Sequence, residues 1–270
     1  MKNIFIWAMQ TGADGWFLGL AKSKKLWYTY KNGKKERFLA LEQIYTIPVN
    51  EAFEASAADV SCGCAICALY KKLEENELDL ILGASMMEPD VRIRTNKEGF
   101  CRKHYDKMFV RKNRLGMALT LESHLDELRE ETKDGLLGAK GARAKKRISE
   151  LEATCYVCAR IDFHFKHMVE TAVMLWDKDE DFLPKLKAQP MFCLPHYRML
   201  LEEGERRLNK KRSAEFAKDC AAVVEPYFDK LRGDVSWFCK KYDYRHDEEP
   251  WYDSKDAVER AIRFLRGDMA

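Results

Sequence analysis

The sequence predicts a mainly α-helical protein built from two repeats. A Cys-x-x-Cys pair followed by a Cys-x-x-His pair occurs twice along the chain. Apolar residues within and after these motifs recur at spacings of three and four, which is the period of an amphipathic helix. The chain is 46 % hydrophobic and 11 % aromatic, values typical of a globular protein. Its 270 residues suffice for one large core or for two modest domains.

The two Cys/His sets agree in order and spacing. The second set follows the first by 91 residues at the Cys-x-x-Cys pair and by 92 residues at the Cys-x-x-His pair. Neighbouring residues repeat as well, since Phe100 matches Phe192 and Tyr105 matches Tyr197. The first set is Cys64, Cys67, Cys101 and His104, and the second is Cys155, Cys158, Cys193 and His196.

Three thiolates and one imidazole make a closed tetrahedral Zn²⁺ site. The sequence therefore predicts two Zn²⁺ ions per chain, one held by each set, so that each repeat is stapled by its own Cys₃His site. Four protein ligands leave no position for water, which favours a structural role over a catalytic one. Cysteines are also common in ordinary cores, but the duplication of all four positions argues against that interpretation. Spacing alone does not separate zinc from iron, and an iron–sulfur protein is the alternative.

We expect the Cys-x-x-Cys pairs to lie on the first turns of helices. Ile66, Leu69 and Leu73 follow the first pair at helical spacing. A helix start favours thiolate over thiol, because its free N–H groups and positive dipole end face the sulfur.

The remaining cysteines and two histidines have simpler interpretations. Cys62 precedes the first pair and could be an alternate ligand, but nothing matches it before the second pair, so we interpret it as a bystander. Cys220 lies on an apolar stripe and is expected in the core, whereas Cys239 has no expected placement. His164 and His167 could share a metal, yet no third ligand is in register with them.

The composition shifts along the chain indicate five segments. They are an N-terminal extension (1–44), a first helical zinc repeat (45–131), a basic linker with several glycines (132–147), a second helical zinc repeat (148–232), and an aromatic segment with a C-terminal helix (233–270).

A small β-hairpin is one interpretation of the N-terminal extension. Asn32 and Gly33 lie between the apolar stretches 26–30 and 38–41, a pattern typical of a type I′ turn. A loosely attached extension is the other interpretation.

One segment has charged residues that the second repeat does not reproduce. Glu88, Asp90 and Arg92 flank Pro89, and they form a candidate ligand or contact loop. The simpler interpretation is a proline turn whose charged residues cap helices and pair locally.

Several separated motifs together resemble a bacterial domain-of-unknown-function family, found mainly in anaerobic Gram-positive bacteria. The resemblance extends from Tyr45 to the C-terminus and implies paired metal-type motifs on a helical scaffold, with no established activity. The motifs are residues 45–53, the Cys64-x-x-Cys67 pair, residues 87–93, Gly99-Phe100-Cys101-x-x-His104, Phe192-Cys193-x-x-His196 and residues 241–245.

These observations favour a non-enzymatic protein-interaction scaffold with two structural zinc ions. The alternatives are a redox or metal-sensing protein that uses its Cys-x-x-Cys thiols, a nucleic-acid binder, and an enzyme that uses the Glu88 segment. No nucleophile elbow, phosphate-binding loop or zinc-deaminase motif is visible, so no catalytic residue is assigned. A net charge of +3 gives nucleic-acid binding little support.

We expect a cytoplasmic protein with an unidentified protein partner and no membrane association. The apolar run 4–9 passes directly into polar residues without a cleavage-site pattern. No stretch approaches the roughly 20 apolar residues that span a bilayer. The sequence does not indicate the oligomeric state.

Overall fold

The computed structural model describes residues 10–11, 15–16, 35–133 and 141–268. The chain divides into two compact units, Met1–Arg37 and Phe38–Ala270. The first unit contains the strands β1 (Gln10–Thr11) and β2 (Gly15–Trp16), which pair antiparallel with Gln10 opposite Trp16.

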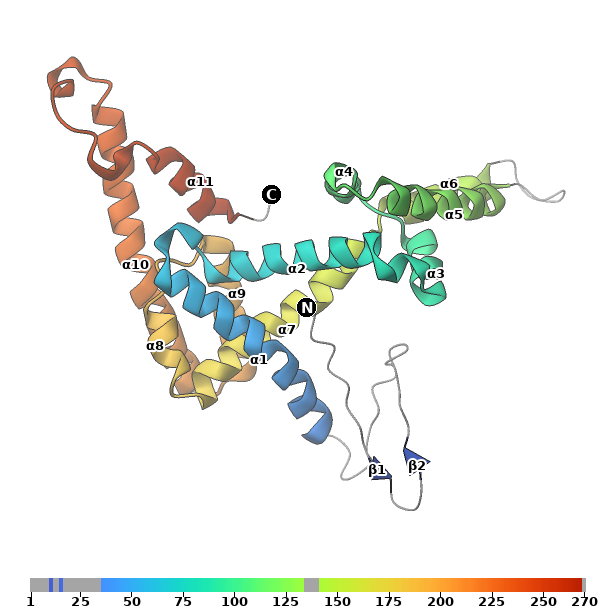
Figure 1. The fold of residues 1–270 in the computed structure, drawn as a ribbon. Helices are drawn as coiled ribbons and strands as arrows, with labels where there is room; N and C mark the ends of the chain where they lie inside the picture. Colours follow the sequence, from blue (N-terminus) through green and yellow to red (C-terminus); the bar gives the residue numbers. More distant parts are fainter. Residues whose placement is uncertain (1–9, 12–14, 17–34, 134–140, 269–270) are drawn as a thin grey trace. The chain divides into compact units, whose positions relative to one another are not determined.

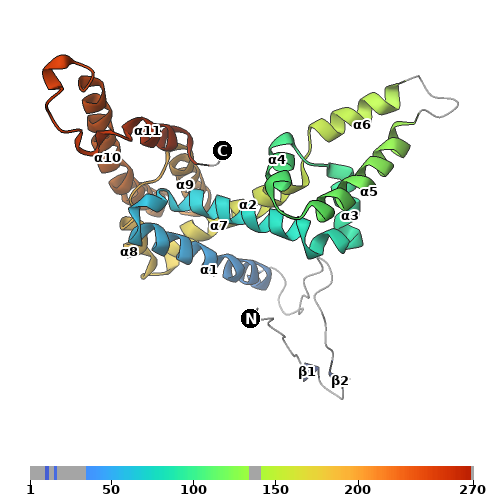
Figure 2. The same ribbon diagram turned by 45° about the horizontal axis from the view of Figure 1, so that its top comes forward.

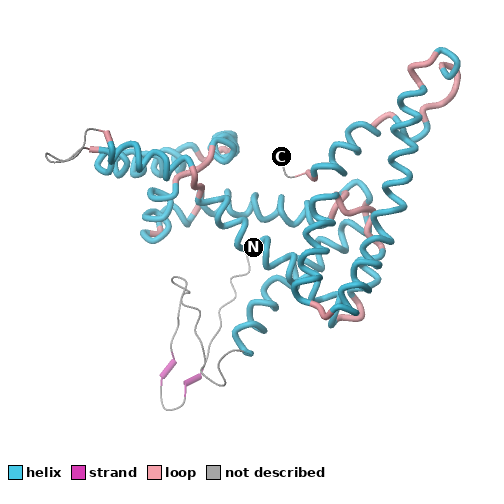
Figure 3. The backbone as a smooth tube through the Cα atoms, turned by 180° about the vertical axis from the view of Figure 1, so that it is seen from behind, coloured by secondary structure: helices cyan, strands magenta, loops and turns pink. Residues whose placement is uncertain are grey.

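The rest of the described chain is almost entirely helical (Figures 1 and 3). The helices are α1 (Lys35–Ala58), α2 (Ala65–Leu82), α3 (Pro89–Glu98), α4 (Arg102–Val110), α5 (Arg114–Thr132), α6 (Ala142–Glu152), α7 (Tyr156–Lys178), α8 (Phe182–Lys187), α9 (Leu194–Arg207), α10 (Lys210–Lys240) and α11 (Ala257–Arg266), with short 3₁₀ turns η1 (Val60–Cys62), η2 (Ala84–Met87), η3 (Tyr244–His246) and η4 (Tyr252–Ser254).

The second strand of the expected hairpin is wrong. Residues 38–41 lie inside α1, where the chain is helical from Lys35 onward. The turn at Asn32-Gly33 and the stretch 26–30 lie outside the described residues. The sequence keeps a helical period from residue 38 to Phe53, and the burial of Tyr45, Val49 and Phe53 supports this helix over the turn signal.

The second unit is organised around α2 and α7, which pack against each other (Figures 1 and 2). Glu77 near the end of α2 contacts Arg160 near the start of α7. Tyr70, earlier on α2, packs edge-on against Phe165, later on α7. The two helices therefore run antiparallel, and the start of each lies towards the end of the other.

Other helices pack around this pair in sequence-local groups. Helices α3, α5 and α6 contact one another, and α4 contacts both α2 and α5. Helix α9 packs on α7, α10 packs on α8 and α9, and α11 packs on α9 and α10. A continuous cluster of buried apolar side chains joins these groups, and Phe53, Phe182 and Phe192 are fully buried within it.

Two of the expected segment boundaries fall inside continuous helices. Position 44 lies within α1 and position 232 within α10, so neither marks a break in secondary structure. In the expected linker, α5 ends at Thr132 and α6 begins at Ala142. Arg147 of this segment is buried, pairs with Glu131 and donates to the Asn96 carbonyl.

A tight turn at Gly99 places the start of α4 beside the start of α7. Gly99 has φ +60°, a conformation that favours glycine, and a Cβ there would lie 2.4 Å from a Leu151 methyl carbon. The Gly99 carbonyl accepts a 2.9 Å hydrogen bond from the Tyr156 N–H. Across the described residues, no helix is both long enough and apolar enough to cross a bilayer.

Candidate metal centres

The eight residues of the duplicated motifs come together in two clusters. Cluster 1 consists of Cys64 and Cys67 from the start of α2 with Cys193 and His196 from the start of α9. The His196 Nδ1 atom lies 3.6, 3.3 and 3.2 Å from the sulfurs of Cys64, Cys67 and Cys193. The Cys67 and Cys193 sulfurs are 3.7 Å apart.

Cluster 2 has the same composition at two other helix starts. It consists of Cys155 and Cys158 from α7 with Cys101 and His104 from α4. The His104 Nδ1 atom lies 3.2 Å from the Cys101 and Cys155 sulfurs and 3.4 Å from the Cys158 sulfur. The Cys101 and Cys158 sulfurs are 3.9 Å apart.

The predicted grouping of these residues is wrong, although the prediction of two Cys₃His clusters is confirmed. Each cluster joins the Cys-x-x-Cys pair of one repeat to the Cys-x-x-His pair of the other. The antiparallel packing of α2 on α7 explains the exchange, because α9 packs on α7 and thereby reaches the start of α2. Neither repeat is closed by its own cluster.

The placement of the motifs on helix starts follows the prediction. Cys64, Cys101, Cys155 and Cys193 are the N-caps of their helices, all in extended backbone conformation. The third residue after each N-cap then turns back towards it across the first helical turn. In α7 this brings the Cys158 N–H within 3.5 Å of the Cys155 sulfur. The chain leaves the helical conformation just before the second Cys-x-x-Cys pair, because α6 ends at Glu152 and α7 begins at Tyr156.

The atomic spacing fits a single tetrahedral ion in each cluster. Bonds of about 2.3 Å to sulfur and about 2.0 Å to nitrogen require ligand–ligand separations of roughly 3.8 Å for two sulfurs and roughly 3.5 Å for sulfur and nitrogen. The observed separations of 3.7 and 3.9 Å between sulfurs agree with this geometry. A disulfide needs sulfurs about 2.05 Å apart, and all of these cysteines are free thiols. The donor set therefore could hold two ions.

Burial makes both clusters unfavourable places for uncompensated charge. It is the main reason that the pKa of the Cys64 thiol rises to about 12, and it lowers the pKa of His196 to about 4. Burial likewise raises the pKa values of Cys155 and Cys158 and lowers that of His104. A neutral imidazole is the form that binds a metal, and a divalent cation among the sulfurs would reverse the preference for thiol.

The two histidines differ in what their second ring nitrogen contacts. His104 Nε2 lies 3.1 Å from a carboxylate oxygen of Glu74, a buried residue that also accepts from Lys107 at 2.6 Å. Burial acts to raise the pKa of Glu74, but the hydrogen bond from Lys107 and the charge of Lys103 outweigh it and lower the pKa. Glu74 is therefore a carboxylate that can fix the ring of His104.

Cluster 1 lacks this carboxylate. Phe165 stands ten residues after Cys155, as Glu74 stands ten residues after Cys64, so the two are equivalent in the repeats. The Phe165 ring packs on His196, and His196 Nε2 is buried without a hydrogen-bond partner. If Nδ1 faces a metal, Nε2 carries the proton, and its lost hydrogen bond costs about 1–3 kcal/mol.

Two grooves are lined by residues at matching positions of the two repeats. A groove of about 390 Å³ between α7 and α9 is lined by Phe165 and Met199, and one of about 360 Å³ between α2 and α4 by Glu74 and Lys107. Glu74 corresponds to Phe165 and Lys107 to Met199 in the duplicated sequence. The duplication thus persists in space, with Glu74 and Lys107 in one groove at the positions that Phe165 and Met199 hold in the other.

A model for one protein family matches residues 40–270, which is most of the chain and includes both clusters. The chain belongs to a family of unknown function, DUF6062. Comparison with curated proteins and with solved structures found no match. The match to DUF6062 begins within α1, so the strands β1 and β2 lie outside it.

The charged segment after η2 has a local structural role. Glu88 is the N-cap of α3 and Asp90 lies in its first turn, where a carboxylate suits the helix dipole. Arg92 donates to the Leu119 carbonyl and to the Ser123 hydroxyl on α5. These contacts fasten α3 to α5.

The other singled-out residues lie outside the two clusters. His164 Nδ1 is 2.8 Å from the Tyr45 hydroxyl, and His167 Nδ1 is 2.8 Å from Glu170, so they have different partners. Cys220 is fully buried, as expected, whereas Cys62 and Cys239 are exposed.

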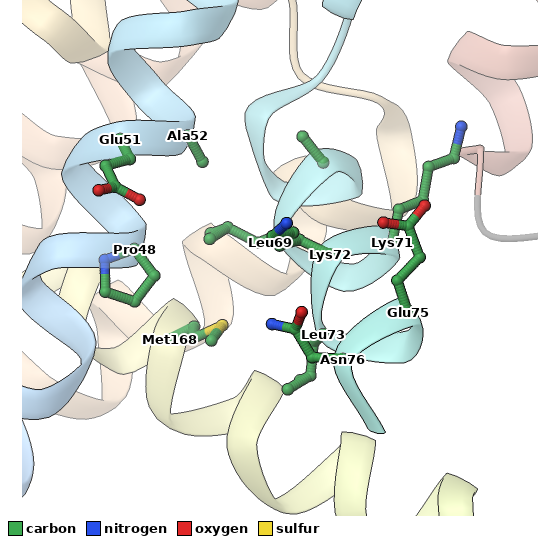
Figure 4. A pocket seen from close by; sticks show the side chains of 11 residues that line it. Pro48, Glu51, Ala52, Leu69, Lys71, Lys72, Leu73, Glu75, Asn76 and Met168 are labelled. Carbon is green, nitrogen blue, oxygen red and sulfur yellow. The ribbon is translucent and has the colours of Figure 1, made fainter. Parts of the chain in front are cut away.

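A third pocket, of about 420 Å³, lies between α1, α2 and α7 (Figure 4). Pro48, Leu69 and Met168 give it an apolar interior, and Glu51 and Lys72 also line it. Sequence reasoning found neither this pocket nor Glu74. An isolated Glu on a helix belongs to no motif. The sequence shows only that Glu74 lies seven residues, or about two helical turns, after Cys67.

Proposed function

We propose that this protein is a helical scaffold that binds two structural Zn²⁺ ions, one in each cluster, and acts through contacts with other proteins. The observation that carries the proposal is the exchanged grouping of the ligands. Each ion would join a helix start in one repeat to a helix start in the other. The metal would thereby hold the two repeats together as one unit.

The energies involved support a structural role. Structural zinc contributes an apparent 10–16 kcal/mol in small peptides, which is comparable to the roughly 5–15 kcal/mol stability of a whole domain. Cys67 and Cys193 belong to distant parts of the chain, and cross-linking them through an ion restricts the unfolded chain strongly. Reduced thiols of this kind persist in a reducing compartment, which supports the cytoplasm.

The distances also support a single ion over an iron–sulfur cluster. In each cluster the four ligand atoms all lie within 4.8 Å of one another. In an iron–sulfur centre with several irons, the cysteines bind to different iron atoms, so the cysteine sulfurs lie further apart. A mononuclear iron would fit the same four ligands, so the identity of the metal needs a direct measurement.

The test is elemental analysis of the protein purified without added metal, with an absorption spectrum of the same sample. We expect two zinc atoms per chain and no visible absorption. If the analysis finds iron and the spectrum has a visible band, the metal is iron, and the redox alternative is favoured. A folded protein with all nine thiols free and no metal would overturn the proposal.

Exposed apolar residues on α11 support the role of protein contacts. Val258, Ile262 and Leu265 follow one another at helical spacing and are 41, 60 and 52 % exposed. Singly exposed apolar residues are common, but a stripe on one helix is typical of an interaction surface. We expect Ile262→Glu to abolish the capture of partners without changing the metal content, and unchanged capture would exclude this surface.

Nucleic-acid binding has less support. In the described part of the basic segment 132–147, Arg147 is buried, whereas Arg143, Lys145 and Lys146 on α6 are exposed. Retention on DNA or RNA that falls steeply with salt would favour this alternative.

A further inference from the structure

We propose that the two clusters exchange metal unequally, with cluster 2 as the exchangeable site and cluster 1 sealed by the C-terminal segment. Glu74 is the positioning residue of cluster 2, and it holds the His104 ring ready for the metal. The ligand is a divalent ion of the zinc class. This inference rests on the proposed binding of two metal ions.

The ligands of the two clusters differ in exposure. In cluster 1, Cys64 and Cys67 are 2 and 4 % exposed, and Cys193 and His196 are fully buried. In cluster 2, Cys101 and Cys158 are only half-buried. A chelator or a thiol reagent can therefore approach cluster 2 without a change in the fold.

The backbone that follows α11 covers cluster 1. Gly267 has φ +78°, and a Cβ there would lie 3.4 Å from the Cys193 sulfur and 3.7 Å from the Cys67 sulfur. The Asp268 N–H donates to the Cys67 sulfur at 3.3 Å, and the Asp268 carboxylate pairs with Lys71 on α2. Metal can leave cluster 1 on this side only after the segment moves.

Helix α11 anchors that segment. Phe264 is 1 % exposed and packs against the rings of Tyr227 and Phe228 on α10. Three residues later the chain reaches Gly267, so detaching the seal also strains a buried aromatic contact. The seal is therefore part of the packed structure.

Glu74 gives cluster 2 a feature that cluster 1 lacks. A carboxylate on the second ring nitrogen orients a ligating imidazole and makes it a better donor, and its loss typically lowers metal affinity 10–100-fold. Glu74 is itself held by Lys107, and Lys103 lies 3.4 Å from it. The His104 ring thus stays oriented when the metal leaves, so cluster 2 can bind a metal ion again.

The experiment follows release of both ions from fully loaded protein. Excess EDTA is added, released zinc is measured with a metal-sensitive dye, and brief N-ethylmaleimide labelling with mass spectrometry identifies the freed thiols. We expect one equivalent to leave in a separate, faster phase, because two thiols of cluster 2 are open to solvent whereas residues 267–268 cover cluster 1. The exposed Cys62 and Cys239 react at once, and among the cluster thiols Cys101, Cys155 and Cys158 should be labelled first.

Two sets of variants separate the seal from the positioning residue. Removal of residues 267–270 should accelerate release from cluster 1 and leave cluster 2 unchanged. Glu74→Phe copies the apolar environment of cluster 1 and should weaken zinc binding at cluster 2 about 10–100-fold. Glu74→Gln keeps a hydrogen-bond acceptor and should restore most of the affinity, and Glu75→Gln at the exposed neighbour should change nothing.

The outcomes separate this inference from the proposed function. Release of both ions at one rate, or from cluster 1 first, overturns the inference while two bound zinc ions still support the function. Equal affinities in Glu74→Phe and Glu74→Gln overturn the role of Glu74. A protein that never takes up two metal ions overturns the proposed function and this inference with it.

Discussion

Arg160 on α7 donates to both carboxylate oxygens of Glu77 on α2, at 3.0 and 2.9 Å. Their side chains are 20 and 7 % exposed, so the pair is largely shielded from water. Removing one member of a buried ion pair leaves the other charge uncompensated, which costs about 3–5 kcal/mol. We expect Glu77→Ala to lower the free energy of unfolding by roughly that amount, as measured by urea denaturation.

The matching positions of the two repeats provide a control for this pair. Met168 corresponds to Glu77, and Leu69 corresponds to Arg160. The double variant Glu77→Met/Arg160→Leu should recover most of the lost stability, because apolar residues of similar volume often replace a buried ion pair without loss. A double variant less stable than Glu77→Ala would show that the pair is needed for the packing of α2 on α7.

The exchanged grouping of the metal ligands can be tested by counting ions in double variants. Cys64 and Cys193 belong to one cluster, whereas Cys64 and Cys101 belong to different clusters. We expect Cys64→Ser/Cys193→Ser to retain about one zinc per chain, because cluster 2 stays intact. Cys64→Ser/Cys101→Ser should bind none tightly, since both clusters lose a thiolate. The reverse pattern of zinc contents would restore the grouping within each repeat.

The stability of the protein should fall in mild acid partly because of His124. Burial lowers the pKa of this histidine, against the hydrogen bond that its Nδ1 makes with the Asn96 carbonyl at 2.9 Å. Below about pH 6.5 the unfolded chain gains a proton that the folded protein takes up only at lower pH. Stability from His124 is therefore fully present above pH 6.5 and is lost as the pH falls towards the folded pKa.

The variant His124→Gln isolates this contribution. We expect its unfolding free energy to change less than that of the native protein between pH 7.5 and pH 5.5, whatever its absolute stability. Effects of the metal ligands cancel in the comparison, because both proteins keep them. Identical slopes in the two proteins would assign the acid sensitivity to other groups.

Lys241 organises the loop that follows α10. It is 8 % exposed, and its ammonium donates to the carbonyls of His246, Asp247 and Glu249 at 2.6, 2.9 and 2.7 Å. One hydrogen bond to a charged group contributes about 1.5–3 kcal/mol. Lys241→Met should therefore speed amide hydrogen exchange in residues 242–250 by at least about tenfold. The exposed neighbour Lys240 is the control, and Lys240→Met should leave the exchange rates unchanged.

The sequence allowed the members of the two clusters and their local structure to be predicted, because both depend on short-range rules. A Cys-x-x-Cys or Cys-x-x-His pair brings two ligand atoms together within one helical turn, and the apolar spacing after Cys64 identifies the helix that follows. The choice of partner pair depends on how α2 packs on α7, which no local pattern records. Grouping within each repeat follows the shorter chain connection, and the packed structure uses the longer one.

The sequence does not predict the role of a residue that acts through a single tertiary contact. Glu74 and Phe165 are equivalent by position, but only the structure shows that one supports His104 and the other covers His196. The expectation of a strand at residues 38–41 is wrong for a related reason. The Asn-Gly signal is local, whereas the helix α1 gains its stability from the packing of residues such as Phe53 in the core.

The exchange of ligands has a consequence for the origin of the chain. A single repeat carries half of each cluster, so it could complete neither one alone. Two copies of such a repeat, related by a two-fold axis between antiparallel helices, would complete both at once. The present chain has the ligand connectivity of that homodimer with its subunits fused. In such a fused chain the two copies are free to diverge, and Glu74 and Phe165 are different residues at equivalent positions.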